Sequence, residues 1–67
     1  MMNTMTFTKR AINEVANIMQ AQGGDRGTIK MMHNMVLVAV SHHSETVTVE
    51  NPAVIGFMQK YAYRLTA

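Results

Sequence analysis

Apolar residues near the start of the chain recur at the spacing of one helix face. They fall at i, i+3, i+4 and i+7: Ile12, Val15, Ala16 and Met19. Thr6 and Thr8 each carry a hydroxyl oxygen that can accept an unpaired amide hydrogen at a helix N-terminus. Gly23 and Gly24 follow the apolar stripe, and glycine readily takes the left-handed conformation that ends a helix. This pattern predicts a helix over residues 8–22.

An apolar run rich in valine occupies the middle of the chain, at residues 35–40, and indicates a buried strand. Residues 28–32 predict a shorter strand before it, with a turn at 33–34. One long strand over 28–41, with a bulge at 33–34, is an open alternative. Beyond a turn at 41–45, alternating valines and polar residues predict a further strand at 46–50.

The last helix has the clearest predicted start. Asn51 is a favourable N-cap, and Pro52 suits the first turn because its missing N–H costs nothing there. Apolar residues then keep helical spacing: Val54, Met58, Tyr61 and Leu65. The predicted fold is a single small α+β domain over residues 1–67, in two layers, ordered helix, antiparallel sheet of two or three strands, helix. Residues 1–5 are expected to form a frayed N-terminus.

The strand interpretation creates a candidate interface. Met35, Leu37 and Ala39 would share one strand face, opposite the face formed by the valines. If both helices cover the valine side, this face is left exposed, and exposed apolar patches usually mark interfaces. Met31 and Met32 lie beside it, and methionine adapts to varied partners, although a place in the core is an equal alternative for these methionines. We therefore expect these five residues to contact a second copy or another protein. The alternative, an apolar face that simply remains in solvent, stays open.

Composition strengthens the expectation of self-association. The chain has only 67 residues and no cysteine, so a small core must offset the chain entropy without a disulfide. Its 48% hydrophobic and 15% charged residues argue against disorder.

No apolar run reaches the roughly 18 residues of a membrane span, so no membrane association is predicted. Cysteine-free composition is compatible with a reducing cytoplasm, which is the predicted location.

The net charge of +2 comes from scattered residues rather than from a basic block. Nucleic-acid binding is therefore a second candidate function, in which cations contact phosphates and a tyrosine stacks on bases. The candidate contacts are Lys9, Arg10, Lys30, Lys60, Tyr63 and Arg64.

Candidate chemistry is sparse. Three histidines, His33, His42 and His43, lack the partners of a structural zinc site, so no metal or cofactor is predicted. No catalytic motif is present. A third candidate function is an enzyme whose site forms across a dimer interface, with His33 or His42 as the general acid–base. The glycine-rich loop 23–27 follows a predicted helix, whereas phosphate-binding loops precede one.

By exclusion, the sequence predicts a non-enzymatic protein-interaction module that acts as a homo-oligomer. Small proteins of this kind are often inhibitors or adaptors, including those encoded by phages and mobile elements.

Overall fold

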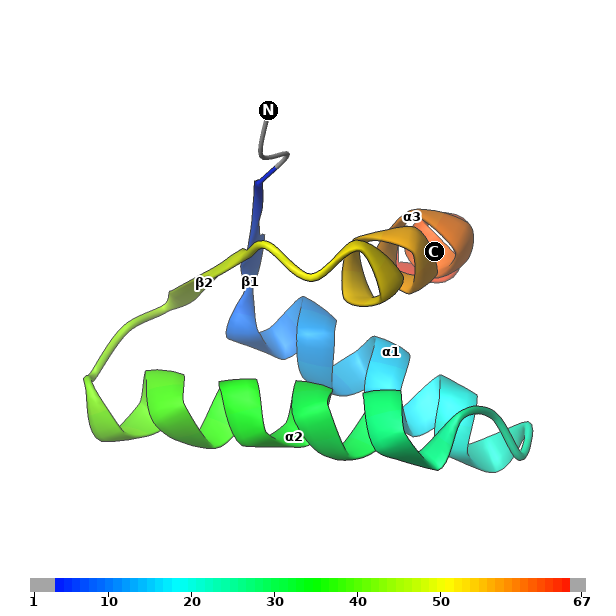
Figure 1. Ribbon diagram of the computed structural model, residues 1–67. Coiled ribbons are helices and arrows are strands. Elements are labelled where there is room, and N and C mark those ends of the chain that lie inside the picture. Colours follow the sequence, from blue (N-terminus) through cyan, green and yellow to red (C-terminus); the bar gives the residue numbers. More distant parts are fainter. Residues whose placement is uncertain (1–3, 66–67) are drawn as a thin grey trace.

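The computed structural model describes residues 4–65 (Figure 1). The elements run in the order β1 (Met5–Thr8), α1 (Lys9–Ala21), α2 (Arg26–Ser41), β2 (Thr46–Val49) and α3 (Pro52–Leu65). The two strands form one antiparallel sheet. The predicted α+β class is confirmed. The sheet has two strands, and a third helix, α2, occupies the segment where strands were expected.

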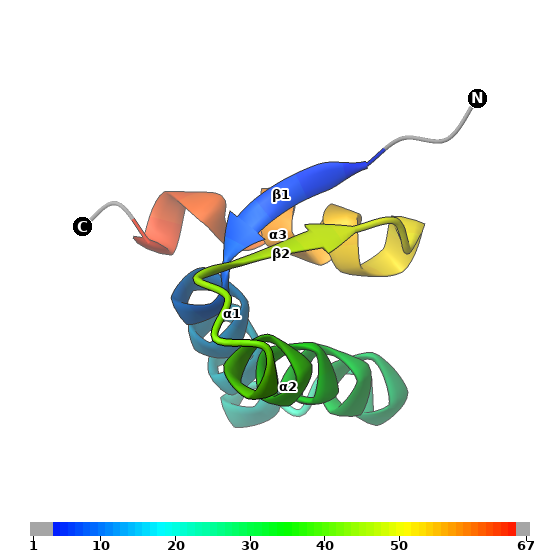
Figure 2. The same cartoon turned by 90° about the vertical axis from the view of Figure 1, so that its left-hand side faces the viewer.

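The two strands form a short ribbon on one side of α3 (Figure 2). Met5 pairs with Val49 at one end, and Thr8 pairs with Thr46 at the other. Val49 is buried, whereas the threonines of both strands are exposed. The strand predicted at 46–50 is confirmed. The first strand was not predicted. Residues 1–5 were expected to form a frayed start, yet Met5 lies in β1; residues 1–3 lie outside the described residues.

The first predicted helix is confirmed as α1. The Thr8 hydroxyl oxygen accepts a hydrogen bond of 3.1 Å from the backbone N–H of Ala11. At the other end, Gly23 takes a φ of 72°, and the N–H of Gly24 donates to the Met19 carbonyl at 2.8 Å. These bonds satisfy carbonyls that the last turn of a helix leaves unpaired.

The strands predicted over 28–41 are wrong, both as two strands and as one bulged strand, because this segment is α2. Its buried residues follow helical spacing: Thr28, Ile29, Met32 and Ala39. Asp25 caps the helix by accepting from the Gly27 N–H at 3.1 Å and from the Thr28 hydroxyl at 2.7 Å. Ile29 and Met32 of this stripe pack with α1 in the core, and this helix-to-helix contact outweighs the strand preference of the valines. The predicted turn at 33–34 lies inside the helix.

The end of α2 repeats the geometry found at the end of α1. His43 adopts a φ of 54°, a left-handed conformation that glycine takes more easily. Its N–H donates to the Val40 carbonyl at 3.1 Å, and the Ser44 N–H donates to the Ala39 carbonyl at 2.9 Å. The predicted turn after the apolar run is therefore a helix terminus.

The hydrophobic core surrounds α1, which lies between α2 and α3 (Figures 1 and 2). Ile12 and Met19 of α1 are almost completely buried, as are Met32 of α2 and Met58 of α3. The predicted start of α3 is confirmed, since the Asn51 side-chain oxygen accepts from the backbone N–H groups of the second and third helical residues, at 2.9 and 3.2 Å. The three helices thus share one core, with α2 and α3 on opposite sides of α1.

Candidate interaction surface

Exposed apolar side chains lie on the parts of α2 that the core leaves uncovered. Within residues 4–65, four of the five exposed large hydrophobic residues belong to this helix. We call them the α2 apolar patch: Met31 (40% exposed), Leu37 (67%), Val38 (50%) and Val40 (51%). In neither view does another described element lie on the side of α2 away from α1 (Figures 1 and 2).

Helical geometry explains why the patch exists. A 16-residue helix that is apolar on much of its circumference can turn only one side to α1. Met32 and Ala39 occupy that inner side, so Leu37 and Val38 fall outside it. The protein therefore leaves in water an apolar surface that its own core cannot cover.

The residues of the predicted interface are divided between the two sides of α2. Met32 is 0% and Ala39 5% exposed, so both belong to the core. Met35 is half-buried and packs against the core. Met31 and Leu37 are exposed, as members of the α2 apolar patch. The expectation that residues 35, 37 and 39 share a face is wrong, because alternation by two applies to strands and not to helices.

Two patch residues were not predicted from the sequence. Val38 and Val40 had been placed on the covered face of a strand, yet each is about half exposed. For Val38, helical spacing supplies the missing signal, because this residue lies seven residues after Met31 and therefore on the same side of the helix. Val40 lies about half a turn away from Met31, so the same spacing does not identify it.

A shallow hollow adjoins the patch. It is lined by α2 alone: Gly27, Lys30, Met31, His33, Asn34 and Leu37. Apolar and polar side chains thus lie side by side in this hollow.

The basic residues proposed for nucleic-acid contacts are spread over three helices. Lys9 forms an ion pair of 3.6 Å with Glu45, and Arg10 one of 3.7 Å with Glu14. Lys30 lies on α2, whereas Lys60 and Arg64 lie on α3. The Tyr63 side chain lies outside what the structure describes. Nucleic-acid binding remains a prediction, and two of its cations are already paired with acids.

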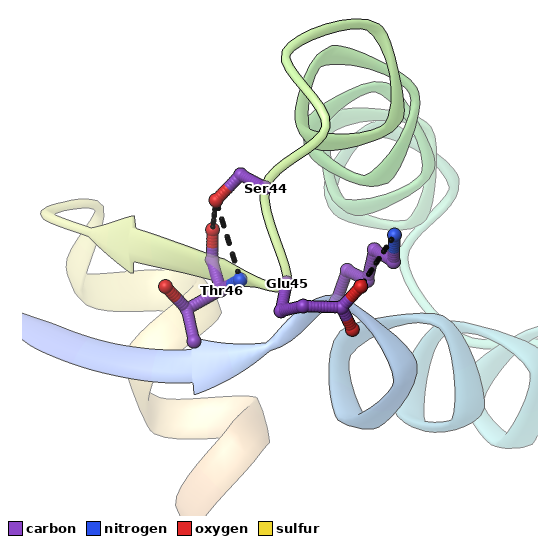
Figure 3. A network of polar contacts seen from close by, with 4 residues as sticks. Ser44, Glu45 and Thr46 are labelled. Carbon is purple, nitrogen blue, oxygen red and sulfur yellow. Dashed lines mark hydrogen bonds and ion pairs between the residues drawn. The ribbon is translucent and has the colours of Figure 1, made fainter.

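The Lys9–Glu45 pair belongs to the connection between α2 and β2 (Figure 3). The Ser44 hydroxyl donates to the Thr46 carbonyl at 2.7 Å, and the Thr46 N–H lies 3.3 Å from the same hydroxyl oxygen. The Lys9 N–H also donates to the Glu45 carbonyl at 3.0 Å. These contacts join the start of α1 to the end of α2, which gives Lys9 a structural role.

The titratable residues do not converge. Among residues 4–65, no three histidine or acidic side chains stand close enough to share a metal ion. His33 contacts Asn17, with 3.4 Å between its Nε2 and the amide oxygen, whereas His42 and His43 end α2. The hydrogen bond from the Thr28 hydroxyl, helped by the Gly27 N–H, lowers the pKa of Asp25. This carboxylate is therefore suited to capping a helix and not to donating a proton.

No helix in the described part of the chain has both the length and the apolar character to cross a membrane. Comparison with protein-family models gives no match, and no curated protein or solved structure is significantly similar to this chain.

Proposed function

We propose that this protein is a non-enzymatic interaction module that binds through the α2 apolar patch. The observation that carries the proposal is the exposure of Leu37, 67%, on a helix whose opposite side is already buried. Removing one leucine side chain from water contributes about 1.5–3 kcal/mol. A partner that covers Leu37 and its neighbours therefore gains binding energy that the free protein leaves unused.

The first partner that we propose is a second copy of the chain. Symmetric dimers join the same surface of each subunit, so one apolar helix face is sufficient for both sides of the interface. Two α2 helices can pack side by side with their patches together. Such a dimer adds apolar burial to a 67-residue chain that has no disulfide.

The proposed biological action is occupation of a surface on another macromolecule, as an inhibitor or adaptor does. This action requires neither a cofactor nor a catalytic group. The cysteine-free sequence is compatible with a cytoplasmic setting. A phage or mobile element is a fitting source for a protein of this kind.

Light scattering over a dilution series tests the self-association. Wild type should be a dimer at high concentration, and Leu37→Gln should be a folded monomer there. Because a symmetric dimer contains the residue twice, its dissociation constant should rise roughly a hundredfold or more.

Met5→Gln is the matched control, since Met5 is an exposed apolar residue on β1 and not on α2. It should leave the solution mass unchanged. Wild type that stays monomeric at millimolar concentration would contradict self-association. Equal effects of the two substitutions would contradict the choice of surface.

A further inference from the structure

A second hollow lies where the end of α1 meets the start of α2. Its lining comes from α1, the connecting loop and α2: Gln20, Gly23, Gly24, Arg26, Ile29, Lys30 and His33. Gly23 keeps the loop side open, because no described heavy atom outside Gly23 and its two chain neighbours lies within 4 Å of the position that a Cβ would take there. The hollow therefore has room for a small group beside polar side chains.

The lining of this hollow is cationic. Arg26 and Lys30 stand one helical turn apart on α2, and no aspartate or glutamate lines the hollow. The ion pairs found within residues 4–65 belong to Lys9 and Arg10, so Arg26 and Lys30 are not neutralised by a described acid. Gln20 and His33 add side chains that can donate hydrogen bonds.

Asp25, the acid nearest in sequence, is occupied elsewhere. One carboxylate oxygen accepts from the Gly27 N–H and the other from the Thr28 hydroxyl, at 3.1 and 2.7 Å. This carboxylate also closes the N-terminus of α2, so an anion in the hollow must be bound by side chains and not by the helix amides.

We propose that this hollow binds the phosphate group of a small ligand. Two full positive charges without a lining acid match a doubly charged oxyanion better than a singly charged carboxylate. The arginine offers a planar fork of donors and the lysine a point charge, the pair of cations commonly used for phosphate. The site does not rest on the proposed protein interaction, although Lys30 and His33 also line the hollow that adjoins the α2 apolar patch.

Titration with inorganic pyrophosphate at constant ionic strength, followed by amide NMR shifts, tests the site. The backbone amides of Gly23, Gly24 and Ile29 should shift most. Arg26→Gln with Lys30→Gln should raise the dissociation constant at least about tenfold, because two charge-assisted contacts are lost.

Lys60→Gln with Arg64→Gln is the matched control. This pair has the same two residue types at the same spacing, on α3 and outside the hollow. It should leave pyrophosphate affinity within about twofold. An equal loss in both double variants, or shifts centred away from the loop, would show binding that follows net charge and would overturn the proposal.

A short DNA duplex separates a small phosphate ligand from a nucleic-acid backbone. Pyrophosphate should shift the Gly23 and Gly24 amides, whereas the duplex should leave them unshifted. A duplex that shifts these amides more strongly than pyrophosphate would overturn the assignment to a small ligand.

Discussion

Single polar side chains fix where the helices of this protein begin. Thr8, Asp25 and Asn51 each accept from a backbone N–H group just inside the following helix. The caps at Thr8 and Asn51 were predicted from sequence, because a recognisable apolar stripe follows each of them. The cap at Asp25 was not, because the segment after it was assigned to strands. A cap can be recognised only when the element that it starts is identified correctly.

The cap at Asp25 predicts a pH-dependent stability. The pKa of its carboxyl is lower in the folded protein than the ordinary value of 3.8, chiefly through the Thr28 hydroxyl. The ionised carboxylate therefore stabilises the fold above that value, and the stabilisation disappears as the pH falls through the lowered pKa. Asp25→Asn should melt at a lower temperature than wild type near pH 7, and the difference should disappear at an acid pH below the lowered pKa.

Thermal melts followed by circular dichroism at both pH values measure this difference. Asparagine keeps one oxygen able to cap the Gly27 N–H, but its amide nitrogen cannot accept from the Thr28 hydroxyl, so the variant loses that hydrogen bond together with the charge. A melting difference that is the same at both pH values would contradict this explanation.

At the scale of elements, α2 shows why part of the fold could not be predicted. Residues 35–40 are all apolar, and an unbroken apolar run fits a buried strand and one side of a helix equally well. Valine favours strands only weakly, and packing against α1 outweighs that preference. Length held the better clue, since 28–41 contains neither glycine nor proline and is long for a strand. The clear apolar stripe of residues 12–19 allowed no such ambiguity, and α1 was predicted correctly.

Two glycines in or beside helices should respond in opposite directions to alanine. Gly56 lies inside α3, is exposed, and has no described heavy atom within 4 Å of the position that a Cβ would take. Gly56→Ala should stabilise the protein by about 0.5–1 kcal/mol through higher helix propensity. Gly23 is also unobstructed, but its φ is 72°, so Gly23→Ala should destabilise by roughly 1 kcal/mol.

Urea denaturation of both variants gives the two free energies of unfolding. Because neither site is crowded, the sign of each change reports backbone conformation and not a steric clash. A stabilising Gly23→Ala would contradict the left-handed end of α1.

For the whole molecule, the candidate surface was partly accessible from sequence. Leu37 was predicted from the alternation of a strand, and Met31 from its place beside that strand face; both are exposed for another reason, because they lie outside the buried side of a helix. Met32 and Ala39 were placed on the wrong side because the side on which a residue lies depends on the element that contains it. The hollow at Arg26 and Lys30 joins two helices through a loop, so only the three-dimensional packing brings its lining together.

Two adjacent methionines of α2 give the most direct test of which side of this helix faces the core. A chain of 67 residues has a total stability of about 3–10 kcal/mol. Met32 is 0% exposed, so Met32→Ala should cost about 2–5 kcal/mol by leaving a cavity, enough to unfold much of the protein. Met31 is 40% exposed, and Met31→Ala should change stability by less than about 0.5 kcal/mol in dilute, monomeric protein.

Urea denaturation at low and high protein concentration measures both effects. Met32→Ala should destabilise at every concentration, because the residue lies in the core of each subunit. Met31→Ala should lower stability only where wild type is associated, since its side chain would then be buried against the partner. A costly Met31→Ala in the monomer would place residue 31 in the core and would contradict the outward face of α2 on which the proposed interaction depends.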